Sequence, residues 1–266
     1  MRAFILVATM ALTLASAVPA AAHHNWLLLL PPEIAGDAGL LVACFGHALP
    51  LGDSPPPLED YGELVLVSPS GSKRPVSRLV PLGKPSIAAV ELSEPGLWCA
   101  AGWREHYGCK TTEGYQRGRR KEVEDRGFTV VESKHTFRYG KTYTLVGKGM
   151  ETGSLRVGHD LEMVPDASIA RLDPGDSLEL VVLLDGKPRA GMSVSGTREG
   201  SSEELAHPEE REKFLVTGTT DESGRVSLPL EEPGRWFFIT EQVVDNPEPG
   251  VDKLFRSATL TLDIGG

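Results

Sequence analysis

Short apolar or alternating segments recur along the whole chain, and turn-forming residues separate them. The segments are too short for helices, and 29 glycines and 20 prolines divide them as turns divide strands. Residues 258–264 alternate apolar and polar side chains, as a strand with one buried face does. The pattern predicts an all-β protein of antiparallel β-sandwiches, with strands at 40–45, 63–67, 87–92, 97–101, 128–131, 142–146, 178–184, 193–195, 226–230, 236–240 and 258–264.

Two similar segments indicate two structural units. Residues 93–100 read SEPGLWCA and residues 231–238 read EEPGRWFF, and in each a Pro-Gly turn precedes a strand with an inward tryptophan. Between them, residues 157–174 contain two prolines and several turn-formers, as a linker does. We therefore predict two immunoglobulin-like antiparallel β-sandwich domains, at residues 23–160 and 161–266.

The first 22 residues have the layout of a cleaved secretory signal peptide. Met1-Arg2 gives a positive start, an apolar run follows, and Ala20 and Ala22 supply the small residues that signal peptidase needs. The run is short for a membrane span, which favours cleavage over a retained N-terminal anchor. No second apolar run of about 18 residues follows. The mature chain is therefore expected to be periplasmic or otherwise exported, with no transmembrane segment.

The charge of the chain bears on its expected partners, and its cysteine count bears on disulfide formation. The chain carries 27 basic and 37 acidic residues, a net charge of −10, whereas a nucleic-acid footprint needs a basic face. No nucleic-acid partner is therefore expected. In an oxidising compartment, three cysteines predict one disulfide and one free thiol. Of the three pairings, Cys99–Cys109 closes the shortest loop and is preferred, while Cys44–Cys99 would join two predicted strands.

Two histidines stand directly after the predicted cleavage site. With cleavage after Ala22, the α-amine and imidazole of His23 could chelate a metal ion, and a second histidine such as His24 would complete a set of three nitrogens. Such nitrogen-rich, near-planar geometry suits Cu²⁺ or Ni²⁺. Cleavage after Ala20 would also leave a chelating terminus, Ala-Ala-His. His47 follows Gly46 at a predicted strand end, so His23, His24 and His47 are the predicted metal ligands.

The remaining polar features point away from catalysis. Residues 108–127 carry clustered charges of both signs, which is typical of a solvated excursion or short helix, with docking of an anion or a partner as the alternative. Ser70 and Ser195 lack a nucleophile-elbow pattern, and the chain has no phosphate-binding loop. We therefore expect that the protein is not an enzyme.

The chain carries an ordered series of motifs: HNWL at 24–27, GH at 46–47, LEMVP at 161–165, LDPGD at 172–176, LLDGKP at 183–188, TDESG at 220–224 and PGRW at 233–236. This series resembles a family of exported bacterial proteins that carry a domain of unknown function. Its members are often labelled as the periplasmic component of a cobalt/nickel uptake system of the ABC type. The resemblance implies β-sandwich domains and a periplasmic role in transition-metal uptake, and it matches His24 and Gly46-His47 as positions of interest.

Three functional hypotheses remain open at this point. The first is an exported component of nickel/cobalt uptake that binds Ni²⁺ or Co²⁺, with Cu²⁺ as a further candidate, and that serves a membrane uptake system. The second is a metal-free exported β-sandwich module that binds an envelope protein or a polysaccharide. The third is a copper redox enzyme with an N-terminal histidine chelate. Clustering of His23, His24 and His47 in the folded chain would favour the first.

Overall fold

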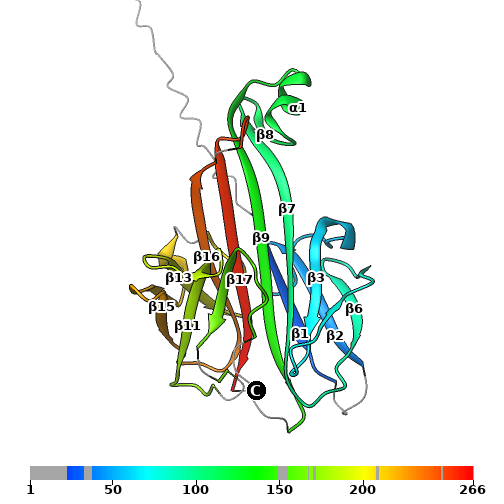
Figure 1. Cartoon of the computed structure of the whole chain (residues 1–266), viewed down its shortest axis with the longest axis vertical. Coiled ribbons are helices and arrows are strands. Elements are labelled where there is room, and N and C mark those ends of the chain that lie inside the picture. The colour runs from blue at the N-terminus through cyan, green and yellow to red at the C-terminus, as the bar shows by residue number, and fades with distance from the viewer. Residues whose placement is uncertain are drawn as a thin grey trace, which may run out of the picture.

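The computed structural model describes residues 23–32, 38–148, 155–166, 168–169, 172–207, 210–246 and 248–265. The predicted signal peptide, residues 1–22, lies outside the described residues. The described part is nearly all β-structure in three sheets, which confirms the all-β prediction (Figure 1). Among the described residues, helical structure is limited to α1 (Arg120–Asp125) and two short 3-10 turns, Leu58–Asp60 and Arg211–Lys213.

One large sheet runs through the middle of the molecule and two smaller sheets lie beside it. The central sheet has the order β14 (Val216–Thr219), β13 (Ser193–Arg198), β16 (Gly234–Asp245), β17 (Lys253–Ile264), β9 (Val130–Val146), β7 (Gly96–Thr111), β3 (Tyr61–Val67) and β4 (Lys73–Pro75), with β8 (Gly114–Arg117) paired to β7. The N-terminal sheet has the order β1 (His24–Leu30), β2 (Ala38–Gly46), β6 (Ser86–Glu91) and β5 (Val80–Pro81). The C-terminal sheet contains β10 (Leu161–Pro165), β11 (Ser177–Leu184), β12 (Lys187–Pro188) and β15 (Arg225–Pro229).

The two smaller sheets cover opposite faces of the central sheet. Successive side chains of a strand point to opposite faces, and those of β7 divide between two cores. Cys99 lies in one core with Leu180 of the C-terminal sheet. The adjacent Trp98 lies in another core with Leu41 of the N-terminal sheet. The arrangement is therefore a three-layer β-sandwich.

The two halves of the chain share the central sheet. Strands β9 and β17 pair in parallel along its middle, and all other strand pairs are antiparallel. The two Pro-Gly-x-Trp segments adopt the same local geometry on either side. The indole of Trp98 donates to the Glu94 carbonyl at 2.8 Å, and that of Trp236 to the Glu232 carbonyl at 3.0 Å. The division into immunoglobulin-like domains at 23–160 and 161–266 stays a prediction.

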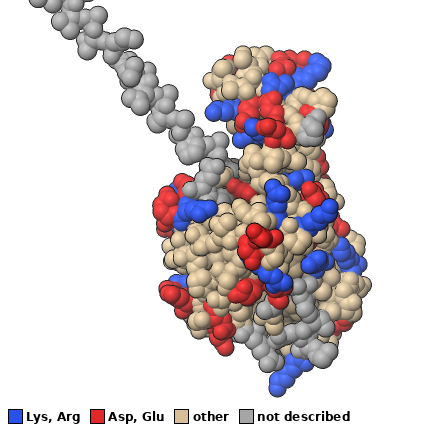
Figure 2. Space-filling view, turned by 60° about the vertical axis from the view of Figure 1, so that its left-hand side comes forward, with Lys and Arg blue, Asp and Glu red and all other residues tan. Residues whose placement is uncertain are grey.

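The ends of β7 and β9 extend beyond the sandwich and form a projecting lobe with β8 and α1 (Figure 1). The lobe includes residues 108–127, where a solvated excursion or short helix was predicted. Figure 2 shows basic and acidic residues side by side on it. Arg119 pairs with Glu248, and Arg120 lies 2.5 Å from Asp252. These arginines therefore pair with carboxylates near the β16–β17 turn, which leaves the alternative of anion docking without support from them.

The predicted disulfide is wrong. All three cysteines are free thiols in the interior. Cys99 and Cys109 lie ten positions apart on the same strand, a separation of about 33 Å at about 3.3 Å per residue. Cys44 belongs to the N-terminal sheet and packs near Trp26 in a different core from Cys99. The pairing failed because residues 99–109 form a continuous strand rather than a loop.

Burial raises the pKa of the Cys44 and Cys99 thiols to about 12, so both are protonated and unreactive at neutral pH. Within the described ranges, no helix is long and apolar enough to cross a membrane.

Candidate metal centre

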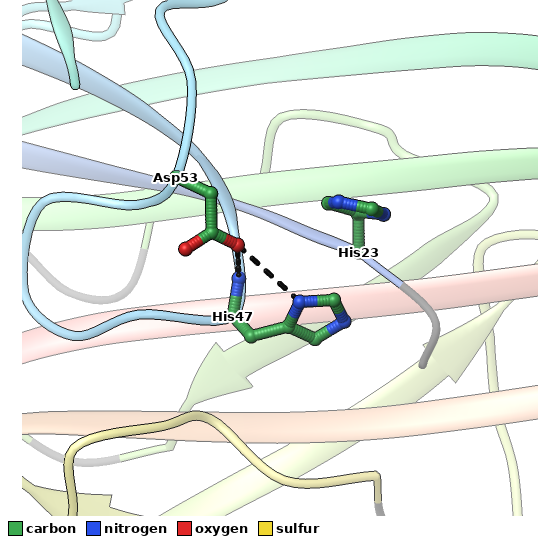
Figure 3. A group of neighbouring side chains, drawn as sticks. All are labelled: His23, His47 and Asp53. Atoms are coloured by element: carbon green, nitrogen blue, oxygen red, sulfur yellow. Dashed lines mark hydrogen bonds and ion pairs between the residues drawn. The ribbon is translucent and has the colours of Figure 1, made fainter. Parts of the chain in front are cut away.

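The pairing of β1 with β2 places His23 beside His47. In this antiparallel pair His24 is opposite Gly46, so the residue before His24 and the residue after Gly46 become neighbours. The two imidazole rings have their centroids 4.5 Å apart (Figure 3). The register of one strand pair therefore brings together two of the three predicted ligands.

The loop after β2 adds a carboxylate that the sequence did not reveal. The Asp53 amide donates to the Phe45 carbonyl at 2.8 Å, which folds the loop back on the strand end. Asp53 Oδ2 then accepts from the His47 amide at 2.6 Å. Gly46 has φ +133°, and a Cβ there would lie 2.2 Å from Asp53 Oδ2. Only glycine fits this turn, and the Trp26 indole fixes the far side of the loop by donating to the Pro50 carbonyl at 2.8 Å.

The three side chains fit a divalent metal ion. One donor atom from each of His23, His47 and Asp53 lies within 4.8 Å of the others, and no other group among the described residues meets this criterion. Two ligands of one ion lie about 3.0–4.2 Å apart when metal–ligand distances are about 2.1 Å, so small side-chain rotations would close the set. His47 Nδ1 is already 3.3 Å from Asp53 Oδ2, and His47 Nε2 is buried without a hydrogen-bond partner.

The charge states at this cluster suit metal binding. Burial, with the nearby His47 and Arg138, lowers the pKa of His23, so its ring is neutral at pH 7. Burial alone would raise the pKa of Asp53, but hydrogen bonds from the His47 and Ala48 amides lower it overall. Neutral imidazole and ionised carboxylate are the forms that bind metals. Two nitrogens and one oxygen form a set that suits nickel, cobalt, copper or zinc.

Aromatic and cationic side chains hold His23 in place. Its ring stacks on Phe45, with centroids 5.2 Å apart and an interplanar angle of 12°. The buried Arg138 donates from Nε to the His23 carbonyl, and its Nη1 lies 2.8 Å from His106 Nδ1. Arg104 lies over the Phe45 ring at 3.9 Å. The first described residue is therefore anchored by β7 and β9 of the central sheet.

His24 lies near the first cluster, and its Nδ1 faces a different carboxylate. Its ring is edge-on to that of His47, with centroids 6.1 Å apart, and it is 1% exposed. Its Nδ1 lies 3.8 Å from Glu241 Oε1, and His207 Nε2 lies 3.1 Å from Glu241 Oε2. The Leu205 amide donates to the His47 carbonyl at 2.8 Å. This hydrogen bond holds the segment that contains Leu205 and His207 against the loop after β2.

Three residues near these histidines were not predicted as ligands from the sequence: Asp53, Glu241 and His207. The spacing of Gly46-His47 and Gly52-Asp53 was the one local signal for a closed loop that ends in a carboxylate. Glu241 and His207 left no local signal, because they reach the site only through pairing of the central sheet and loop contacts. Other histidines lie elsewhere: His135 contacts Glu105 at 2.7 Å in the projecting lobe.

Fold and site define a three-layer β-sandwich protein with a candidate metal centre where β1, the loop after β2 and the central sheet meet. The chain belongs to the family described as a domain of unknown function (DUF4198), whose model matches residues 20–243. A comparison with curated proteins found no match.

Proposed function

We propose that this is an exported protein that binds a divalent transition-metal ion, Ni²⁺ or Co²⁺, and serves a membrane uptake system. His23, His47 and Asp53 would hold the ion. The observation that carries the proposal is the convergence of their donor atoms within 4.8 Å, with His47 Nδ1 already 3.3 Å from Asp53 Oδ2.

The choice of metals rests on the ligands and on the family resemblance. Imidazole and carboxylate ligands suit Ni²⁺ and Co²⁺, and the proteins that the chain resembles are labelled with cobalt/nickel uptake. Cu²⁺ is the third candidate, because cleavage after Ala22 would give His23 a free α-amine as a further nitrogen ligand. The proposed role is to bind and deliver the ion, with no covalent chemistry. A metal-free module that binds an envelope protein or a polysaccharide is the competing function.

Replacing His47 with alanine is expected to weaken Ni²⁺ binding by at least about 100-fold, since loss of an outer-shell partner alone costs about 10–100-fold. Asp53→Asn should also weaken binding, because it removes the carboxylate charge. The measurement is calorimetric titration of Ni²⁺, Co²⁺, Cu²⁺ and Zn²⁺ into protein secreted and processed by a bacterial host. Intact mass of the same sample identifies the first residue of the mature chain.

His135→Ala is the matched control, because His135 is a partly buried histidine whose ring contacts Glu105 and Glu248 in the projecting lobe. It should bind the metals as the unmodified protein does. If none of the four metals binds more tightly to the unmodified protein than to His47→Ala, the metal-binding proposal fails and the metal-free module is favoured.

A further inference from the structure

Glu241 is a buried carboxylate that stands between two histidines. It lies on β16 beside Ser257 of β17, and its side chain is 7% exposed. His24 Nδ1 approaches one of its oxygens at 3.8 Å, and His207 Nε2 approaches the other at 3.1 Å. The three residues come from β1, from the segment that contacts the loop after β2, and from the central sheet. Both halves of the chain therefore contribute to this group.

The ring of His24 is the member that indicates a ligand. It is 1% exposed, and its Nδ1 has no hydrogen-bond partner. At 3.8 Å the Glu241 oxygen is too distant for a hydrogen bond, yet it lies within the separation of about 3.0–4.2 Å expected for two ligands of one ion. A buried polar atom that lacks a partner destabilises the folded chain. A cation between Nδ1 and the carboxylate would remove that cost.

We propose that His24, Glu241 and His207 form a second site for a divalent transition-metal ion, deeper than the first. The class of ion rests on the proposed function, whereas the residues do not overlap with His23, His47 and Asp53. The rings of His24 and His47 have centroids 6.1 Å apart, so the two sites are adjacent. Two nitrogens and a carboxylate again form a set suited to nickel or cobalt.

The second site closes by movement of His207. The two histidines contact different oxygens of Glu241, so a shared ion requires the His207 ring to approach His24. That ring is 30% exposed, whereas His24 is 1% exposed. Metal at this site would link the two halves of the chain.

The test is the number of Ni²⁺ ions bound per chain, measured by calorimetry and by metal analysis after gel filtration. The unmodified protein should bind two. Glu241→Gln and His207→Ala should each bind one, at the outer site, and His47→Ala should bind one, at the inner site. His135→Ala should still bind two. His207→Ala changes a partly exposed side chain, so it tests the site even if Glu241→Gln fails to fold.

Two results would overturn the second site, and they are distinguishable. One ion in the unmodified protein, lost in His47→Ala and kept in both Glu241→Gln and His207→Ala, rejects the inner site and leaves the proposed function intact. No Ni²⁺ binding by the unmodified protein rejects both.

Discussion

Replacing Lys141 with alanine is expected to lower the free energy of unfolding by about 3–5 kcal/mol, because it leaves a buried carboxylate without its cation. The side chains of Lys141 and Glu162 are 3% and 1% exposed, and Lys141 Nζ donates to Glu162 Oε1. Glu162 also accepts from the Val157 amide at 2.8 Å and the Gly158 amide at 3.0 Å. Burial would raise the pKa of Glu162, but Lys141 and these hydrogen bonds lower it overall, so the carboxylate stays ionised.

The double variant Lys141→Ala/Glu162→Gln is the matched control for this prediction. Glutamine removes the buried charge and keeps an oxygen for the Val157 amide, so the double variant should be more stable than Lys141→Ala alone. Urea unfolding of the three proteins gives the comparison. A free energy for Lys141→Ala within about 1 kcal/mol of the unmodified protein would mean that water solvates this pair, as at an exposed ion pair.

Acidification from pH 6.5 to pH 5 is expected to cost about 2 kcal/mol of stability through His159, and less through the half-buried His106. Burial is the main cause that lowers the pKa of each to about 3, and Arg138 adds to it for His106. Below pH 6.5 the unfolded chain binds protons that the folded rings do not. The stability is therefore complete above pH 6.5 and is lost progressively as the pH falls towards 3.

His159→Leu isolates one of these contributions. The ring of His159 is 5% exposed and packs against Tyr139 with centroids 5.0 Å apart, so leucine replaces it without a titrating group. The variant should lose about 2 kcal/mol less than the unmodified protein between pH 6.5 and 5. Urea unfolding at each pH, with a chelator present to remove metal effects, measures the difference. Equal losses of stability in the two proteins would contradict the lowered pKa of His159.

The sequence predicts the strands of the sandwich better than those of the projecting lobe. Residues 178–184 and 258–264 bury one face or both, so their apolar pattern identifies them. The lobe ends of β7 and β9 lie beyond the two cores, and their pairing depends on backbone hydrogen bonds rather than on an apolar pattern. Predicted strands at 97–101 and 142–146 were therefore correct but too short, and β7 spans Gly96–Thr111.

The residues around the candidate site differ in the same way: some can be recognised from nearby sequence, and others only from the folded chain. His23 and His47 could be predicted because a predicted cleavage site and a predicted strand end are visible in the sequence. Asp53 reaches them through a loop closed by Gly46, and Glu241 through a strand pair distant in sequence. No local sequence pattern predicts that Glu241 lies near these histidines.

The most direct test of the proposed metal centre is a crystal grown with Ni²⁺ and measured at the nickel absorption edge. We predict an anomalous peak between His23, His47 and Asp53, with ligand atoms at about 2.1 Å. An empty position there in crystals of processed protein, with nickel bound elsewhere or not at all, would contradict it.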